Sequence, residues 1–174
     1  TPLGGYVKSY TDIANGKFLG ISWLIWIAIL VAVITWFIFN MTRHGKYMYA
    51  IGGNPQAAEV AGVPVKKTLI IIYAKAAAMY GLAGFMLGAK AGGASVQTGY
   101  GYEMEAIAAC TIGGVSVTGG RGKVSSAIIG VAVFELLKVA LQYLGMNANA
   151  QYIAIGVVIF IAISLDIRKY IARK

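Results

Sequence analysis

Residues 21–39 read ISWLIWIAILVAVITWFIF and contain no charged side chain. As an α-helix, this run would be about 28 Å long, close to the 30 Å or so of hydrocarbon in a typical bilayer. An apolar run of this length is predicted to cross a membrane.

The overall composition agrees with a membrane protein. Apolar residues make up 59% of the 174 residues and charged residues only 12%, whereas about 25% is usual for a soluble domain. The single cysteine, Cys110, excludes a scaffold held together by disulfides. A net charge of +9 would suggest nucleic-acid binding in a soluble domain. Here the basic residues lie at the ends of apolar runs, so the expected partner is a lipid bilayer and not a nucleic acid.

Two other segments are as long as the first. Residues 68–88 contain Lys75, and residues 125–144 contain Glu135 and Lys138. Charged residues inside a span turn toward protein rather than lipid. Both segments are therefore predicted to cross the membrane within a bundle.

Two shorter apolar segments complete the pattern. Residues 153–165 are expected to cross with the help of their flank, residues 149–152. The other short segment is AIAACTIGGVSV, residues 106–117. A stretch of about 10 to 14 apolar residues can be either a crossing or a re-entrant segment, so both interpretations stay open. The predicted fold class is an all-α, polytopic helical bundle with about five membrane segments, one of them short or re-entrant.

The distribution of lysine and arginine predicts the orientation, because these residues accumulate on the cytoplasmic side. If residues 106–117 cross, ten basic residues lie on one side of the membrane and three on the other. If they re-enter, nine lie on one side and four on the other. We therefore expect five crossings, with the first residues outside and the C-terminus in the cytoplasm. The ten are Arg43, Lys46, Lys66, Lys67, Arg121, Lys123, Arg168, Lys169, Arg173 and Lys174, and the three are Lys8, Lys17 and Lys90.

A short, separate helix is predicted in the connector GGNPQAAEVAGVP, residues 52–64. Asn54 suits the N-cap, Pro55 the first helical position, and Gly62 the position after the end. A helix over residues 55–61 would be about 10 Å long, too short to be stable alone, so it must pack on something. From the residues alone, it is either a connector lying on its own membrane domain or a docking site for another protein.

Two stretches, taken together, resemble a known family. They are GKYMYAIGGNPQAAEVAGV, residues 45–63, and GYEMEAIAACTIGGVSVTGGRGKV, residues 101–124. They are similar to the membrane permease subunits of bacterial ATP-binding-cassette importers for ribose, xylose and galactosides, and most of all to those for galactose and methyl galactosides. Such permeases are about twice this length. The resemblance therefore implies that residues 1–174 are the C-terminal half of one transmembrane permease domain.

The resemblance implies a multi-pass subunit of the bacterial inner membrane that carries a monosaccharide, galactose or a methyl galactoside. It would pair with a second copy of itself, receive sugar from an extracellular sugar-binding protein, and dock a separate ATPase that uses ATP and magnesium. The short helix would be the cytoplasmic coupling helix. Its ATPase-docking positions would be Gln56, Ala57, Ala58, Glu59 and Gly62.

No catalytic, cofactor or metal site is expected on this chain. Residues 119–124, GGRGKV, lack the spacing and the Ser/Thr of a phosphate-binding loop, so ATP must be hydrolysed on another chain. His44 is the only histidine, which leaves no material for a Ser–His pair or a histidine metal site. An intramembrane enzyme using Ser116 is accordingly the weakest hypothesis.

Glu135 and Lys138 lie near the middle of their span, three residues apart and on one helical face. Each alone would cost about 2.5 to 3.5 kcal/mol at the centre of a bilayer, and pairing reduces that cost. They are either a structural pair within the helix or a polar lining of the sugar path. An ion-coupled secondary transporter using Glu135 is the alternative function.

Aromatic and small residues give two further expectations. Trp23 and Trp26 near one end of the first span and Trp36 near the other indicate an interfacial belt, with stacking against sugar as the alternative. Gly84 and Gly88 have the small-xxx-small spacing that allows membrane helices to approach closely, and we expect packing contacts there.

Overall fold

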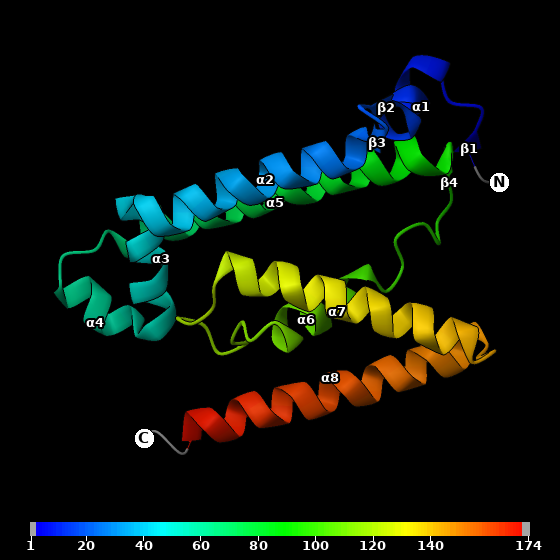
Figure 1. The fold of residues 1–174 in the computed structure, drawn as a ribbon. Helices are drawn as coiled ribbons and strands as arrows, with labels where there is room; N and C mark the ends of the chain where they lie inside the picture. Colours follow the sequence, from blue (N-terminus) through cyan, green and yellow to red (C-terminus); the bar gives the residue numbers. More distant parts are fainter. Residues whose placement is uncertain (1–2, 172–174) are drawn as a thin grey trace. The chain divides into compact units, whose positions relative to one another are not determined.

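The computed structural model describes residues 3–171 and is mainly helical (Figure 1). By contacts, the chain divides into two compact units. Unit 1 comprises Thr1–Gly45 and Val63–Tyr100, and unit 2 comprises Lys46–Gly62 and Gly101–Lys174. The helices are α1 (Lys8–Asn15), α2 (Trp23–Met41), α3 (Arg43–Gly53), α4 (Pro55–Val60), α5 (Val65–Ala91), α6 (Tyr102–Ile112), α7 (Val124–Tyr143) and α8 (Ala148–Ile171), and the two-residue strands are β1 (Leu3–Gly4), β2 (Lys17–Phe18), β3 (Ile21–Ser22) and β4 (Gly93–Ala94).

Among residues 3–171, three helices are long and apolar enough to cross a membrane, and they confirm the three longest predicted segments. They are α2, α5 and α7, with 19, 27 and 20 residues. None of the residues of α2 is buried within the chain, although it is the most apolar of the three. A helix that exposes apolar side chains all round requires lipid or another protein around it.

The segment at residues 106–117 does not form the continuous helix that a helical crossing requires. α6 begins earlier, at Tyr102, and ends at Ile112 after 11 residues, so it is only about 16 Å long and cannot span the hydrocarbon alone. Residues 113–123 then form turns, because Gly114, Gly119 and Gly120 adopt positive φ angles that end a helix. Sequence hydropathy missed this break because glycine is not polar.

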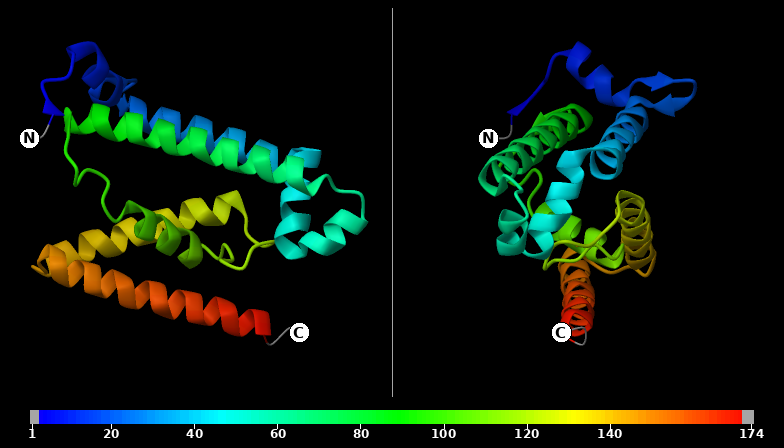
Figure 2. Two further views of the ribbon diagram at one scale, coloured as in Figure 1. Left: turned by 180° about the vertical axis from the view of Figure 1, so that it is seen from behind. Right: turned by 90° about the vertical axis from the view of Figure 1, so that its left-hand side faces the viewer.

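In unit 1, α1 packs against α2 and against the C-terminal part of α5 (Figure 2). The hydroxyl of Tyr10 donates a hydrogen bond to the carbonyl of Phe85 at 2.6 Å, and the two rings are 4.8 Å apart. Antiparallel pairs β1–β4 and β2–β3 tie down the neighbouring loops. These contacts join the start of α2 and the C-terminal end of α5 to α1 and the strands. Lys8 lies in α1, Lys17 in β2 and Lys90 in the last turn of α5.

The packing expected at Gly84 is not made within the described chain, where a methyl group added at Gly84 would meet nothing within 4 Å. Gly88 instead faces the hydroxyl of Tyr10, and a methyl group there would lie 2.8 Å from its oxygen. The spacing of small residues indicates where helices can approach, but not whether a second helix of the same chain is present.

In unit 2, α6 and α7 are antiparallel and in backbone contact. A methyl group added at Gly130 would strike the Ala109 carbonyl, and one at Gly113 would strike the Ser126 carbonyl. α8 turns back beside α7 after residues 144–147, which Figure 1 shows as a hairpin. A cluster of buried side chains joins the three helices, namely Ala108, Ala109, Phe134 and Ile155.

This topology places the C-terminal end of α8 at the same end of unit 2 as the start of α7 (Figure 2). The segment predicted at residues 153–165 lies inside α8, whose shorter apolar stretch is Asn149–Ser164. Of the basic residues expected at this end, Arg168 is exposed. Arg173 and Lys174 lie outside the described residues, as does the side chain of Lys169.

Candidate functional site

The short helix predicted at residues 55–61 is present as α4, Pro55–Val60. The Asn54 side-chain oxygen accepts a hydrogen bond from the Ala57 N–H at 3.0 Å, and Pro55 occupies the first turn. Gly62 follows with a φ of +83°, which releases the chain from the helix. The local capping residues therefore decide both ends of α4.

Replacing Asn54 with alanine is expected to destabilise α4 by about 1 kcal/mol, because the cap hydrogen bond is lost and six residues are too few for a helix to persist without it. Amide hydrogen exchange at Ala57 and Ala58 would measure this loss. Asn54→Asp is the control, since aspartate caps equally well. Equal exchange in the alanine variant and the wild type would contradict the prediction.

The predicted docking residues are not equally accessible. Gln56, Ala57, Glu59 and Gly62 are exposed, whereas Ala58 is only 5% exposed. A side chain the sequence analysis did not select, Val60, is 91% exposed at the end of α4. The surface that α4 presents is therefore one carboxylate with small and apolar neighbours.

The end of α3, which precedes Asn54 and α4, contacts the turn before α7 through two pairs of glycines in unit 2. A methyl group added at Gly52 would lie 2.5 Å from the Gly120 nitrogen, and one at Gly120 would lie 2.7 Å from the Gly53 nitrogen. Beside this contact, the hydroxyl of Tyr49 donates a hydrogen bond to the Gly122 carbonyl at 2.8 Å. The backbone at the end of α3 thus lies directly on the turn that precedes α7.

The charged pair predicted within α7 has a different principal partner. Nζ of Lys138 lies 2.8 Å from Oε2 of Glu105 on α6, and 3.7 Å from Oε1 of Glu135. The side chains of Lys138 and Glu105 are 21% and 19% exposed, but that of Glu135 is 58% exposed. Lys138 therefore joins two helices, and Glu135 is the outer member of a three-residue cluster. Sequence spacing could not reveal Glu105, which lies 33 positions away.

His44 lies in the first turn of α3, just after α2. Its Nε2 atom is buried and has no hydrogen-bond partner among the described residues. Burial lowers the pKa of His44 below its usual value of about 6.5, and the charge of Lys75 lowers it further. The neutral imidazole is the form that fits this position.

A lowered histidine pKa makes stability depend on pH. Below a pH of about 6.5, the unfolded chain binds a proton that the folded chain resists, so the free energy of unfolding falls as pH falls. We expect the melting temperature to drop more between pH 7.5 and pH 5.5 in the wild type than in His44→Gln. Thermal unfolding of both proteins at the two pH values tests this, and parallel pH dependences would contradict it.

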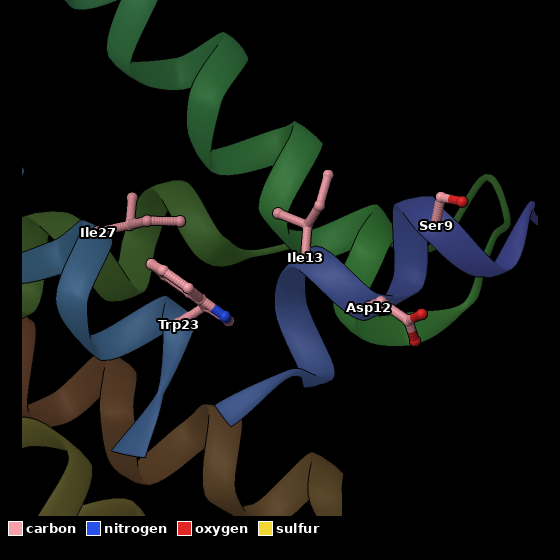
Figure 3. Close-up of a pocket in the computed structure, with 5 residues that line it drawn as sticks. All are labelled: Ser9, Asp12, Ile13, Trp23 and Ile27. Carbon is pink, nitrogen blue, oxygen red and sulfur yellow. The ribbon is translucent and has the colours of Figure 1, made fainter. Parts of the chain in front are cut away.

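An open pocket of about 290 Å³ lies in unit 1 between α1 and the start of α2, lined by Ser9, Asp12, Ile13, Trp23 and Ile27. Figure 3 shows that Ser9 and Asp12 point away from the Trp23 indole. A sugar site needs polar groups that converge beside the aromatic face. Trp23 instead stacks on Phe18 at 5.3 Å, an arrangement that favours an aromatic anchor over a sugar platform.

Within residues 3–171, no three His, Cys, Asp or Glu side chains lie close enough together to hold a metal ion. Ser116 lies in the turn after α6 beside Thr118, with 2.8 Å between the two hydroxyl oxygens.

Comparison with known proteins identifies relatives along the whole chain. The galactose/methyl galactoside import permease protein of Haemophilus influenzae is 38% identical over 178 residues, which cover 100% of this chain and 53% of that protein. Its counterpart from Treponema pallidum is 44% identical, covering 84% of this chain and 28% of that protein. The ribose import permease protein of Escherichia coli is 36% identical, covering 88% of this chain and 48% of that protein.

The chain spans about half the length of the Haemophilus influenzae and Escherichia coli relatives and less of the Treponema pallidum protein. No solved structure matches it. The family model described as "Branched-chain amino acid transport system / permease component" matches residues 4–163. With that match and the apolar helices described above, the chain belongs to this family of polytopic helical membrane permeases.

Proposed function

We propose that this chain is the C-terminal half of the permease domain of an ATP-binding-cassette importer in a bacterial inner membrane. The observation that carries the proposal is α4, a capped six-residue helix with an exposed carboxylate, which directly follows the contact between the end of α3 and the turn before α7. Such a helix is too short to serve as a structural element alone. Its exposed face is the surface on which an ATPase docks.

In this proposal, ATP and magnesium are bound by the partner ATPase, and a second copy of the permease completes the pathway. An extracellular sugar-binding protein delivers the substrate. α4 and the C-terminal end of α8 face the cytoplasm, in agreement with the accumulation of lysine and arginine around them. Docking at Gln56, Ala57, Glu59 and Gly62 is supported by their exposure. Ala58 is buried, so in this proposal it contributes to the packing of α4 and does not contact the ATPase.

The proposed substrate is a monosaccharide, galactose or a methyl galactoside. The support is that relatives named for galactose and methyl galactosides are 38% and 44% identical to this chain, compared with 36% for the Escherichia coli ribose permease. Competition of radiolabelled galactose uptake by methyl galactoside and by ribose distinguishes these sugars. Stronger competition by ribose would overturn the assignment.

Of the charged residues in the membrane, Glu135 is proposed to border the sugar path, because more than half of its side chain is exposed. Lys138 orients it from 3.7 Å away. The ion pair of Glu105 with Lys138 is shorter, at 2.8 Å, and in this proposal it fixes the position of Lys138 beside Glu135.

Replacing Glu59 with lysine is expected to abolish co-purification of the ATPase and to reduce sugar uptake at least tenfold or so, since a charge reversal in a docking surface typically costs several kcal/mol. Glu103→Lys is the matched control, because Glu103 is an exposed glutamate at the start of α6, away from α4. Unchanged co-purification and uptake in Glu59→Lys would rule out docking at α4.

The source of energy separates this proposal from an ion-coupled transporter that uses Glu135. Uptake into vesicles should stop when ATP is removed and continue when a protonophore collapses the proton gradient. Uptake that continues without ATP, stops when a protonophore is added, and is abolished in Glu135→Gln would favour the ion-coupled alternative.

A further inference from the structure

Because α4 has only six residues, it can transmit movement only through the segments to which it is joined. α4 is joined to α3 by the single residue Asn54, so the two must move together at that point. α4 is also joined to α5 by residues 61–64, and this covalent link is the obvious route to the membrane. The structure contains a second route, through unit 2.

That second route starts at Gly52, where the backbones of α3 and of residues 119–120 are so close that no side chain fits between them. A methyl group at Gly52 would lie 2.5 Å from the Gly120 nitrogen, and one at Gly119 would lie 2.9 Å from the Gly52 carbonyl oxygen. Two backbones with no room for a methyl group between them cannot slide past one another as flexible side chains do. A displacement at the end of α3 must therefore displace the turn.

The turn connects α6 with α7, and these two helices are themselves in backbone contact. It follows α6, which ends at Ile112, and it precedes α7, which begins at Val124. Gly113 meets Ser126 and Gly130 meets Ala109 across the helix pair. The pair is further joined by the ion pair of Glu105 and Lys138. α6 and α7 therefore respond as one body to a push on the turn.

We propose that the contact of Gly52 with Gly119 and Gly120, the glycine joint, relays movement of α4 to α6 and α7 during transport. The proposal rests on the proposed function, because the movement originates in an ATPase docked on α4. The joint residues are positioning residues. They bind neither sugar nor ATP, and they set how far the α6–α7 pair moves when α4 moves. Tyr49 reinforces the joint through its hydrogen bond to Gly122.

Two adjacent glycines provide a matched test. Gly52 and Gly53 are both in the last turn of α3, and alanine at either favours the helix. A methyl group at Gly52 would collide with the joint, whereas one at Gly53 meets nothing within 4 Å. Each variant of the complete permease would be assembled with its ATPase and sugar-binding protein in proteoliposomes, and both ATP hydrolysis and galactose import would be measured.

We expect Gly52→Ala to retain the ATPase and hydrolyse ATP within about twofold of the wild type, but to import about tenfold less sugar per ATP, a typical coupling effect. Gly53→Ala should match the wild type. A merely structural role would reduce assembly, hydrolysis and import together and leave the ratio unchanged. An unchanged ratio in Gly52→Ala would overturn the proposal, as would an equal fall in Gly53→Ala.

Tyr49→Phe gives a second measurement that does not crowd the backbone, because it removes only a hydroxyl. We expect a smaller fall, about twofold, in the same ratio, since one neutral hydrogen bond is lost. If the wild-type permease retains no ATPase, both the proposed function and the relay fail. If it does retain one, and all three variants have wild-type ratios, only the relay fails.

Discussion

Gly130→Ala is expected to lower the free energy of unfolding by about 3 kcal/mol, at the upper end of the usual cost of overpacking. Gly130 is buried, and an added methyl group would strike the carbonyl of Ala109 and lie 2.6 Å from the nitrogen of Gly113. These are backbone atoms, so relief requires α6 and α7 to separate. Separation would also open the cluster around Phe134.

The matched control is Gly156→Ala in α8, where an added methyl group meets nothing within 4 Å. Alanine there should leave stability unchanged or raise it by about 0.5 to 1 kcal/mol, because it is the better helix former. Thermal or denaturant unfolding in one detergent or lipid nanodisc would compare the variants. Equal losses at the two positions would show that α6 and α7 are not in backbone contact.

Glu105→Gln is expected to cost about 2 kcal/mol, whereas Glu135→Gln should cost less than about 1 kcal/mol. Breaking a buried ion pair costs 3 to 5 kcal/mol or so, and the remaining exposure and the second carboxylate reduce this cost here. In Glu105→Gln, Lys138 loses the carboxylate that lies 2.8 Å from its Nζ atom and keeps that of Glu135, which lies 3.7 Å away. The ranking is the opposite of the one expected from helical spacing alone.

Unfolding of the two glutamine variants and of Lys138→Met, alone and combined, provides a double-mutant cycle for each pair. The coupling energy of Glu105 with Lys138 should exceed that of Glu135 with Lys138. A larger coupling for Glu135 would restore the intrahelical pair as the main interaction. Glu135→Gln should then be assayed for sugar uptake, since its proposed role is at the path and not in stability.

Local signals explain the helices that could be predicted. The hydropathy of residues 21–39, 68–88 and 125–144 is a property of each segment, and these segments form α2, α5 and α7. The cap at Asn54 acts over three residues and Gly62 follows directly after the helix, which is why both ends of α4 were predictable. The break after Ile112 was less visible, because its cause is the backbone conformation of glycines and not their polarity.

The sequence by itself determined the membrane class, the long spans and the short helix α4, because apolar length and capping depend only on neighbouring residues. Tertiary structure alone decided that Lys138 pairs with Glu105, that Ala58 is buried, and that Gly52 meets Gly120. Each of these depends on which two backbones approach each other. That choice results from packing across the whole of unit 2, and no short stretch of residues encodes it.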